Sequence, residues 1–213
     1  MTHPTFAVSR GRLDALTDGL FAIAMTILVL ELHAPDLPAG AGLPAFQEAL
    51  ARQWPSVVGY VASFGLLGLF WYLHHWLTYS LRRIDAPFFA ANLVFLLLAA
   101  SFPFTLTLML RLRSVGEGGL TLLPYFICLG GLMLSLAAMS LLAIHRDLLA
   151  PHAPVAELRR RGILWLLTGL YLIGLALFRR ALAPLMPHVW VPFVPLFLWR
   201  WWRRRQAKPS AAA

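Results

Sequence analysis

The stretch that decides the fold is RLDALTDGLFAIAMTILVLEL, residues Arg12–Leu32. It contains an apolar helical run long enough to cross a bilayer, for which about 20 residues suffice. Two carboxylates, Asp14 and Asp18, stand at the front of this run. Ionisable groups are costly at membrane depth, and they mark a functional site or a structural tie there. The stretch therefore predicts a transmembrane helix whose two carboxylates need an explanation.

The composition indicates that the chain is a polytopic membrane protein. Its 213 residues are 60% hydrophobic and 13% charged, and its mean hydropathy is +0.72. Soluble domains lie nearer to roughly 45–50% apolar and 25% charged residues. The net charge of +9 does not point to nucleic acid, because the basic residues cluster at the ends of apolar runs. Such clusters are typical of topology signals and lipid headgroup contacts. The single cysteine, Cys128, rules out an intramolecular disulfide.

The hydropathy pattern predicts one transmembrane domain over residues 1–205 and a disordered tail over 206–213. Six spans are expected, at about 13–32, 54–76, 86–110, 120–144, 163–178 and 181–202. The last span contains four prolines and is expected to be kinked, as neighbouring helices allow. Little more than RRALAP separates the last two spans, so a count of five remains an alternative.

The distribution of basic residues predicts a plasma-membrane protein with both termini in the cytoplasm. With six spans and an inner amino terminus, most of the basic residues fall on the inner side: Arg10, Arg12, Arg82, Arg83, Arg146, Arg159–Arg161, Arg200, Arg203–Arg205 and Lys208. The outer segments keep Arg52, Arg111, Arg113, Arg179 and Arg180. An excess of Lys and Arg on the cytoplasmic side is the usual topology signal.

The first span has two distinct faces when its residues are placed about 100° apart around a helix axis. A stripe of branched apolar side chains, flanked by small and hydroxyl residues, follows one face: Leu16, Gly19, Ile23, Thr26, Ile27 and Leu30. Asp14 and Asp18 fall on the opposite side. From the residues alone, the stripe is a helix-packing surface, a lipid-facing surface or a pore lining. The carboxylates and the stripe cannot face the same partner.

The two carboxylates have different expected roles. Asp14 is expected in the first turn, where a carboxylate complements the positive end of the helix dipole. Asp18 lies a turn deeper, so a hydrogen-bonding partner on another helix is expected.

Three motifs resemble the transmembrane protein 175 family of potassium channels. The stretch RLDALTDGLFAIAMTILVL resembles the family signature of Arg, three residues, Phe, Ser, Asp, a small residue and an apolar helix. Arg12, Asp18 and Gly19 match, while Leu16 and Thr17 replace the phenylalanine and the serine. The stretches FWYLHHWLTYSLRRID (Phe70–Asp85) and NLVFLLLAASFPF (Asn92–Phe104) resemble the end of the second helix and the third helix of the family. Beyond Phe104 only the hydropathy pattern agrees.

The resemblance implies an all-α fold with six transmembrane helices, assembled as a homotetramer whose central pore is lined by the first helix. The implied function is a potassium-permeable cation channel that requires no cofactor. Its hydrophobic gate would replace a carbonyl filter, and no TVGYG-like stretch occurs in the sequence. Ile23, Ile27 and Leu30 would form the pore constriction, and Thr26 would contribute to selectivity.

The resemblance also implies a polar network that positions the first helix. In it, Arg12, Thr17 and Asp18 are expected to hydrogen-bond to the second and third helices, where the candidates are Trp71, His74, His75 and Asn92. From the residues alone, His74 and His75 are interfacial side chains at a helix end. No metal site is predicted there, because adjacent histidines point to different helix faces.

Other functional classes compete with the channel interpretation. The main alternative is a proton- or sodium-coupled secondary transporter that uses Asp18, and another is a non-conducting structural membrane protein. An enzyme is not expected, because the sequence has no G-x-S-x-G, no H-E-x-x-H and no Cys/His metal cluster. The expected partners are further copies of the chain, the lipid bilayer and potassium ions, but not nucleic acid.

Overall fold

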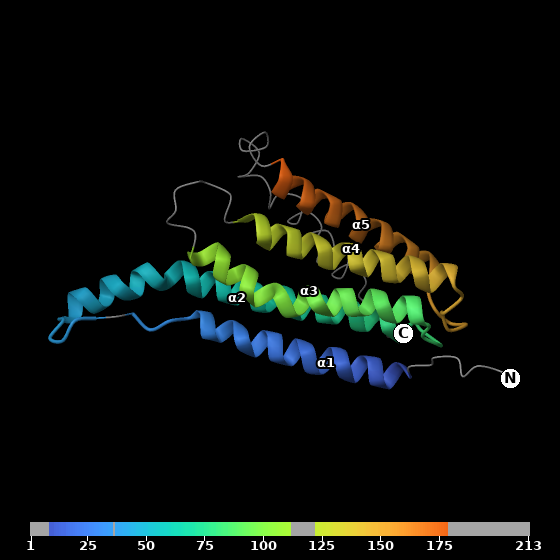
Figure 1. Ribbon diagram of the computed structural model, residues 1–213, viewed down its shortest axis with the longest axis horizontal. Coiled ribbons are helices and arrows are strands. Elements are labelled where there is room, and N and C mark those ends of the chain that lie inside the picture. Colours follow the sequence, from blue (N-terminus) through green and yellow to red (C-terminus); the bar gives the residue numbers. More distant parts are fainter. Residues whose placement is uncertain (1–8, 36, 112–121, 179–213) are drawn as a thin grey trace, which may run out of the picture. The chain divides into compact units, whose positions relative to one another are not determined.

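The computed structural model describes residues 9–35, 37–111 and 122–178. The regular elements of this part are all helical, which confirms the all-α prediction. In order, they are α1 (Arg10–Ile27), the 3-10 helix η1 (Leu28–Glu31), α2 (Leu43–Tyr79), α3 (Ala86–Arg111), α4 (Leu123–His145) and α5 (Val155–Leu177), as Figure 1 shows. Among the described residues, five helices are long and apolar enough to cross a membrane, counting α1 with η1. The predicted span at 181–202 and the tail at 206–213 lie outside the described residues.

Both α2 and α5 begin earlier than residues 54 and 163, where hydropathy predicted their starts. Each added segment contains an ion pair with i,i+4 spacing. Arg52 lies 2.6 Å from Glu48 in α2, and Arg161 lies 2.6 Å from Glu157 in α5. Such pairs stabilise helices in water, so both helices form before their apolar segments begin.

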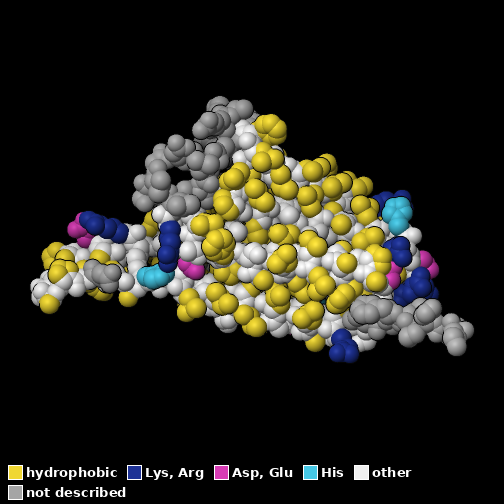
Figure 2. Space-filling view, in the orientation of Figure 1, with side chains coloured by type: hydrophobic (Ala, Val, Ile, Leu, Met, Phe, Trp, Pro, Cys, Tyr) yellow, Lys and Arg dark blue, Asp and Glu magenta, His cyan; other side chains and the backbone are white. Residues whose placement is uncertain are grey.

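The core of the bundle is built around α3, which contacts α1, α2 and α4. Its centre is aromatic, and the largest fully buried side chains include Phe21, Phe70, Phe88, Phe95 and Phe102. The ring centroids of Phe21 and Phe95 lie 5.7 Å apart and join α1 to α3. Outside this core, apolar side chains cover the middle of the face shown in Figure 2, while charged side chains gather toward its ends. This is the pattern of a protein that is solvated by lipid around its middle.

Two glycines bring α4 and α5 into close contact. A Cβ added at Gly130 would lie 2.9 Å from the Gly169 carbonyl oxygen, and a Cβ at Gly169 would lie 2.9 Å from the Gly130 carbonyl oxygen. One further tie joins these helices, because the Ser140 hydroxyl donates to the Leu158 carbonyl oxygen at 3.0 Å. Small residues allow this backbone approach between helices in a membrane, where packing and hydrogen bonds drive association.

The loop after α2 and the loop after α4 form a clasp, here meaning residues 80–85 together with residues 146–150. A β-bridge joins Leu81 to Leu149, and the Arg82 amide donates to the Leu148 carbonyl oxygen at 2.8 Å. Arg82 also forms an ion pair with Asp147 at 3.1 Å. The two loops therefore lie at the same end of the bundle.

Asp85 anchors this clasp to α3. Its carboxylate accepts a hydrogen bond from the Phe88 amide at 3.0 Å, which caps the start of α3, and it also pairs with Arg146. Partial burial alone would raise the pKa of Asp85. The two hydrogen bonds and the positive charge of Arg146 outweigh this effect and lower the pKa from its ordinary value. The carboxylate is thereby held in its charged form.

Candidate functional site: the two faces of α1

The first helix packs through one face and leaves another exposed. Its buried side chains are Leu13, Thr17, Phe21 and Ala24, and Leu28 continues this face into η1. The side chains of the predicted stripe are exposed instead, with 61% of Ile23 and 69% of Leu30 accessible. Ile27 and Leu16 are exposed as well. Within the described chain, α1 therefore presents an apolar surface that its own neighbours do not cover.

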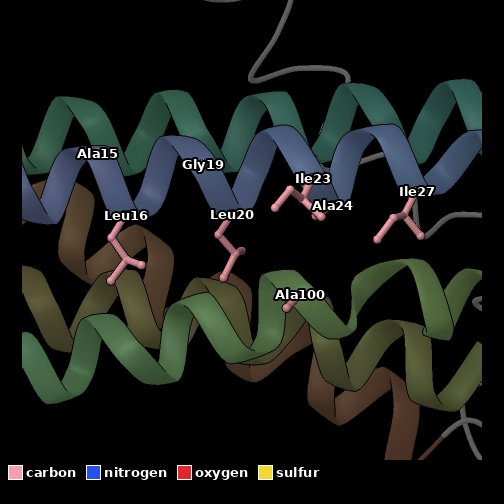
Figure 3. A pocket seen from close by; sticks show the side chains of 8 residues that line it. All are labelled: Ala15, Leu16, Gly19, Leu20, Ile23, Ala24, Ile27 and Ala100. Carbon is pink, nitrogen blue, oxygen red and sulfur yellow. The ribbon is translucent and has the colours of Figure 1, made fainter.

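This surface borders an open apolar groove with a volume of about 490 Å³ between α1 and α3. In Figure 3, Leu16, Leu20, Ile23 and Ile27 project from α1 toward the groove, and Ala100 lies on the α3 side. The remaining lining residues are Ala15, Gly19 and Ala24. The lining is apolar and offers no charged group to a solute.

The deeper carboxylate, Asp18, is hydrogen-bonded to the second helix. The Trp71 indole Nε1–H donates to Asp18 Oδ1 at 2.7 Å. Trp71 is in turn stacked on His75, with ring centroids 5.7 Å apart and planes inclined by 18°. An indole donor to a carboxylate is a charge-assisted hydrogen bond, the stronger kind. Asp18 thus ties the flank of α1 away from Ile23 to α2.

The expectation for Asp14 was wrong. Helix α1 begins at Arg10, one turn earlier than hydropathy suggested, so Asp14 lies beyond the first turn and is not an N-terminal dipole partner. Its carboxylate accepts a hydrogen bond from the Thr78 hydroxyl at 3.0 Å and forms an ion pair with Arg10 at 3.3 Å. Asp14 is therefore a second tie between α1 and α2.

A separate polar contact joins α2 to α3. His74 Nε2 lies 2.6 Å from Asn92 Oδ1, and both side chains are buried. Because the amide oxygen only accepts, the imidazole nitrogen donates. The His74 ring also stacks on Phe95, with centroids 5.0 Å apart. The part of the chain that the structure describes contains no group of three or more His, Cys, Asp or Glu side chains that could hold a metal ion.

Three of the predicted site residues do not join these contacts. Thr17 is buried, but its hydroxyl donates to the Leu13 carbonyl oxygen of its own helix at 3.0 Å. Thr26 is exposed, and its hydroxyl donates to the Ile23 carbonyl oxygen at 2.8 Å. The side chain of the exposed Arg12 has no hydrogen bond or ion pair within residues 9–35, 37–111 and 122–178.

Sequence reasoning missed the group that surrounds Asp14. Arg10 donates to the Tyr79 carbonyl oxygen at 3.3 Å, and its guanidinium lies 5.1 Å from the centre of the Tyr79 ring. The spacing of these residues could have indicated the contact between α1 and α2. Asp14 is four residues before Asp18, and Thr78 is seven residues after Trp71. These spacings place each pair on one helix face, so one antiparallel register satisfies both bonds.

The protein is a polytopic integral membrane protein, because its helices are long and apolar enough to cross a membrane. Its first helix is tied to α2 by polar bonds and carries an exposed apolar stripe. Residues 12–103, somewhat less than half of the chain, match the family described as "Endosomal/lysosomal potassium channel TMEM175". The matched family is one of ion channels and not of enzymes.

Relatives from bacteria and animals each match less than half of the chain. A potassium channel of Streptomyces collinus is 39% identical over 93 residues, which are 44% of this chain and 44% of the relative. A potassium channel of Chamaesiphon minutus is 36% identical over 46% of this chain and 48% of its own length. The cattle protein described as an endosomal/lysosomal proton channel TMEM175 is 31% identical over 45% of this chain and 21% of its own length. The matches thus span less than half the length of these relatives.

The fold is similar beyond the matched half. The crystal structure of a lysosomal potassium-selective channel TMEM175 homologue from Chamaesiphon minutus superposes with a TM-score of 0.60. The superposition covers 79% of this chain and 90% of the other, at 22% sequence identity. At this identity the likeness shows that the two proteins share a fold.

Proposed function

We propose that this chain is one subunit of a homotetrameric, potassium-permeable cation channel of the plasma membrane. Each subunit contributes six transmembrane helices and has both termini in the cytoplasm. The four α1 helices line a central pore, in which Ile23, Ile27 and Leu30 form a hydrophobic constriction and Thr26 contributes to selectivity. The names of the bacterial relatives support potassium as the permeant ion. The cattle relative is called a proton channel, so proton permeation belongs in the same test.

The single observation that carries this proposal is the exposed stripe on α1. Ile23 is 61% accessible although its neighbours Phe21 and Ala24 are buried, so one face of the helix is left for another partner. A ring of branched apolar side chains at a narrow point gates by excluding water, because an ion there finds no substitute for its hydration shell. The constriction residues are apolar, as such a gate requires.

A polar network on the other flank positions this helix. The Asp18–Trp71 and Asp14–Thr78 hydrogen bonds support it, since they tie α1 to α2 at two points. His74, His75 and Asn92 extend the network toward α2 and α3. Satisfied polar groups in a low-dielectric interior hold their elements in one arrangement, because breaking them leaves buried groups unpaired.

The secondary transporter remains a second candidate because of one observation: Asp18 is exposed in spite of its bond to Trp71. A transport carboxylate must reach a cavity that opens to both sides in turn. The apolar groove beside α1 is lined by the other face of the helix and does not include Asp18. This placement favours the channel over the transporter.

The test is ion flux through purified protein in liposomes, comparing K⁺, Na⁺, H⁺ and a large organic cation. Ile23→Asn should wet the constriction and raise K⁺ flux on the order of tenfold, since each 1.4 kcal/mol removed from a barrier is tenfold in rate. Leu167→Asn on α5, also at an exposed apolar position, is the matched control and should leave the flux unchanged. Equal fluxes in the wild type and Ile23→Asn would contradict the gate, and uphill uptake that is lost in Asp18→Asn would establish the transporter.

A further inference from the structure

Arg12 lies on the stripe of α1 that the proposed function assigns to the pore. At about 100° per residue, it falls about 20° from Ile23 and about 40° from Leu16 around the helix axis. It is exposed, in the first turn of α1, at the end of the stripe opposite Leu30. Every other member of that stripe is apolar, small or a hydroxyl residue. Arg12 is therefore its one charged residue.

The acidic groups of α1 are committed to other partners. Asp14 pairs with Arg10 and accepts from Thr78, and Asp18 accepts from Trp71. Arg10 itself lies on the opposite flank, against Tyr79. The charge of Arg12 is thus not neutralised by its own helix within the described residues.

The helix itself gains nothing from a cation at this position. The first turn of a helix carries a partial positive charge, which disfavours a cationic side chain and favours a carboxylate. The contrast with Arg10 is direct, because Arg10 forms an ion pair and packs on an aromatic ring. A role for Arg12 lies outside the single subunit.

We propose that Arg12 from each subunit forms a ring of positive charge at the pore entrance on the amino-terminal side of α1, and that this ring excludes divalent cations more strongly than K⁺. The inference rests on the proposed function and adds the residue that filters cations by charge before they reach the constriction. A mouth lined by one sign of charge changes the local ion concentration exponentially with the ion's valence.

The size of the effect follows from Coulomb's law. Four unit charges about 10 Å from an ion on the axis, in water with a Debye length of about 8 Å, lower the local concentration of a monovalent cation about twofold and of a divalent cation about fivefold. At 1 M salt the Debye length falls to about 3 Å, and both effects vanish. The ring therefore lowers K⁺ entry about twofold, but it lowers divalent entry about fivefold and so reduces divalent block.

The experiment is single-channel recording of the full chain in planar bilayers, with K⁺ as the charge carrier and Mg²⁺ added on the amino-terminal side. Arg12→Gln should raise the potency of Mg²⁺ block about fivefold and the K⁺ conductance about twofold at 0.15 M salt, with both differences lost at 1 M. Arg12→Lys should behave as the wild type, because it keeps the charge. Arg159→Gln removes an exposed arginine of α5 and is the matched control, with no change expected.

The outcomes separate the ring from the proposed function. A wild-type protein that conducts K⁺ while Arg12→Gln shows unchanged Mg²⁺ block overturns the ring alone. An equal change in Arg159→Gln, or a change that persists at 1 M salt, also overturns it, because the effect is then not local electrostatics. A wild-type protein that carries no cation current overturns the proposed function, and the ring falls with it.

Discussion

The hydrogen bond between Trp71 and Asp18 is expected to contribute about 1–1.5 kcal/mol to the stability of the bundle. Bonds to charged groups contribute about 1.5–3 kcal/mol in soluble proteins, whereas interhelical bonds in membranes average about 0.6 and reach about 1.7. The short 2.7 Å distance and the carboxylate acceptor favour the upper part of the membrane range, and the exposure of both side chains lowers it.

A double-mutant cycle isolates this contribution. Trp71→Phe removes the indole donor and keeps a ring to stack on His75, while Asp18→Ala removes the acceptor. The free energy of unfolding would be measured for the wild type, both single variants and the double variant in lipid bicelles. If the bond ties α1 to α2, the two single changes are not additive, and their interaction energy is about 1–1.5 kcal/mol.

The control for this cycle is Trp54→Phe on the same helix. Trp54 is 66% exposed, and its side chain has no hydrogen bond within the described residues. Its loss should change the free energy of unfolding by less than about 0.5 kcal/mol, which is usual for surface positions. An interaction energy below about 0.3 kcal/mol for the Trp71 and Asp18 pair would refute the tie, since independent sites add within that margin.

Two further predictions concern the rest of the fold. Gly169→Ala places a Cβ 2.9 Å from the Gly130 carbonyl oxygen and should destabilise the protein by about 1–3 kcal/mol. Gly174→Ala meets nothing within 4 Å and should stabilise it by up to about 1 kcal/mol, so equal unfolding midpoints would contradict the close contact of α4 and α5. Because the pKa of Asp85 is lowered in the fold, its contribution to stability is present above the unfolded value of about 3.9 and is lost as pH falls through the lowered value. The protection factor of the Arg82 amide, which bonds to the clasp, should therefore fall in acid in the wild type but not in Asp85→Asn, when exchange is compared with the intrinsic rate at each pH.

The number and faces of the described helices follow from local properties of the sequence. Hydropathy predicted five spans that the structure contains, and the helical period placed Ile23 and Asp18 on different faces of α1. Both predictions depend only on the geometry of one helix, in which residues a few positions apart have fixed directions. The exposed Ile23 and the Asp18–Trp71 bond lie on those separate faces.

The pairings between helices did not follow in the same way. The bond between Asp14 and Thr78 could not be predicted, because it depends on the register of α1 against α2, which the packing of the whole bundle sets. Asp14 was therefore assigned to the helix dipole instead. The clasp of Arg82 and Asp147 joins residues 65 positions apart for the same reason. The predicted spans also did not show how far α2 and α5 extend before them, because a helix continues into water where ion pairs support it.

The positions of the ties along α1 bear on how this helix would control the proposed constriction. Asp14 and Asp18 lie in its first half, while Ile23 and Ile27 lie in its second half. Five residues separate Asp18 from Ile23, about 7.5 Å along the axis at 1.5 Å per residue. Hydrogen bonds are directional, whereas the apolar contacts of Phe21 and Leu28 in the second half constrain rotation less. The bond to Trp71 therefore sets the angle of Ile23 through the stiffness of the helix between them, so in the proposed channel a change at Trp71 is expected to act on the constriction without touching it.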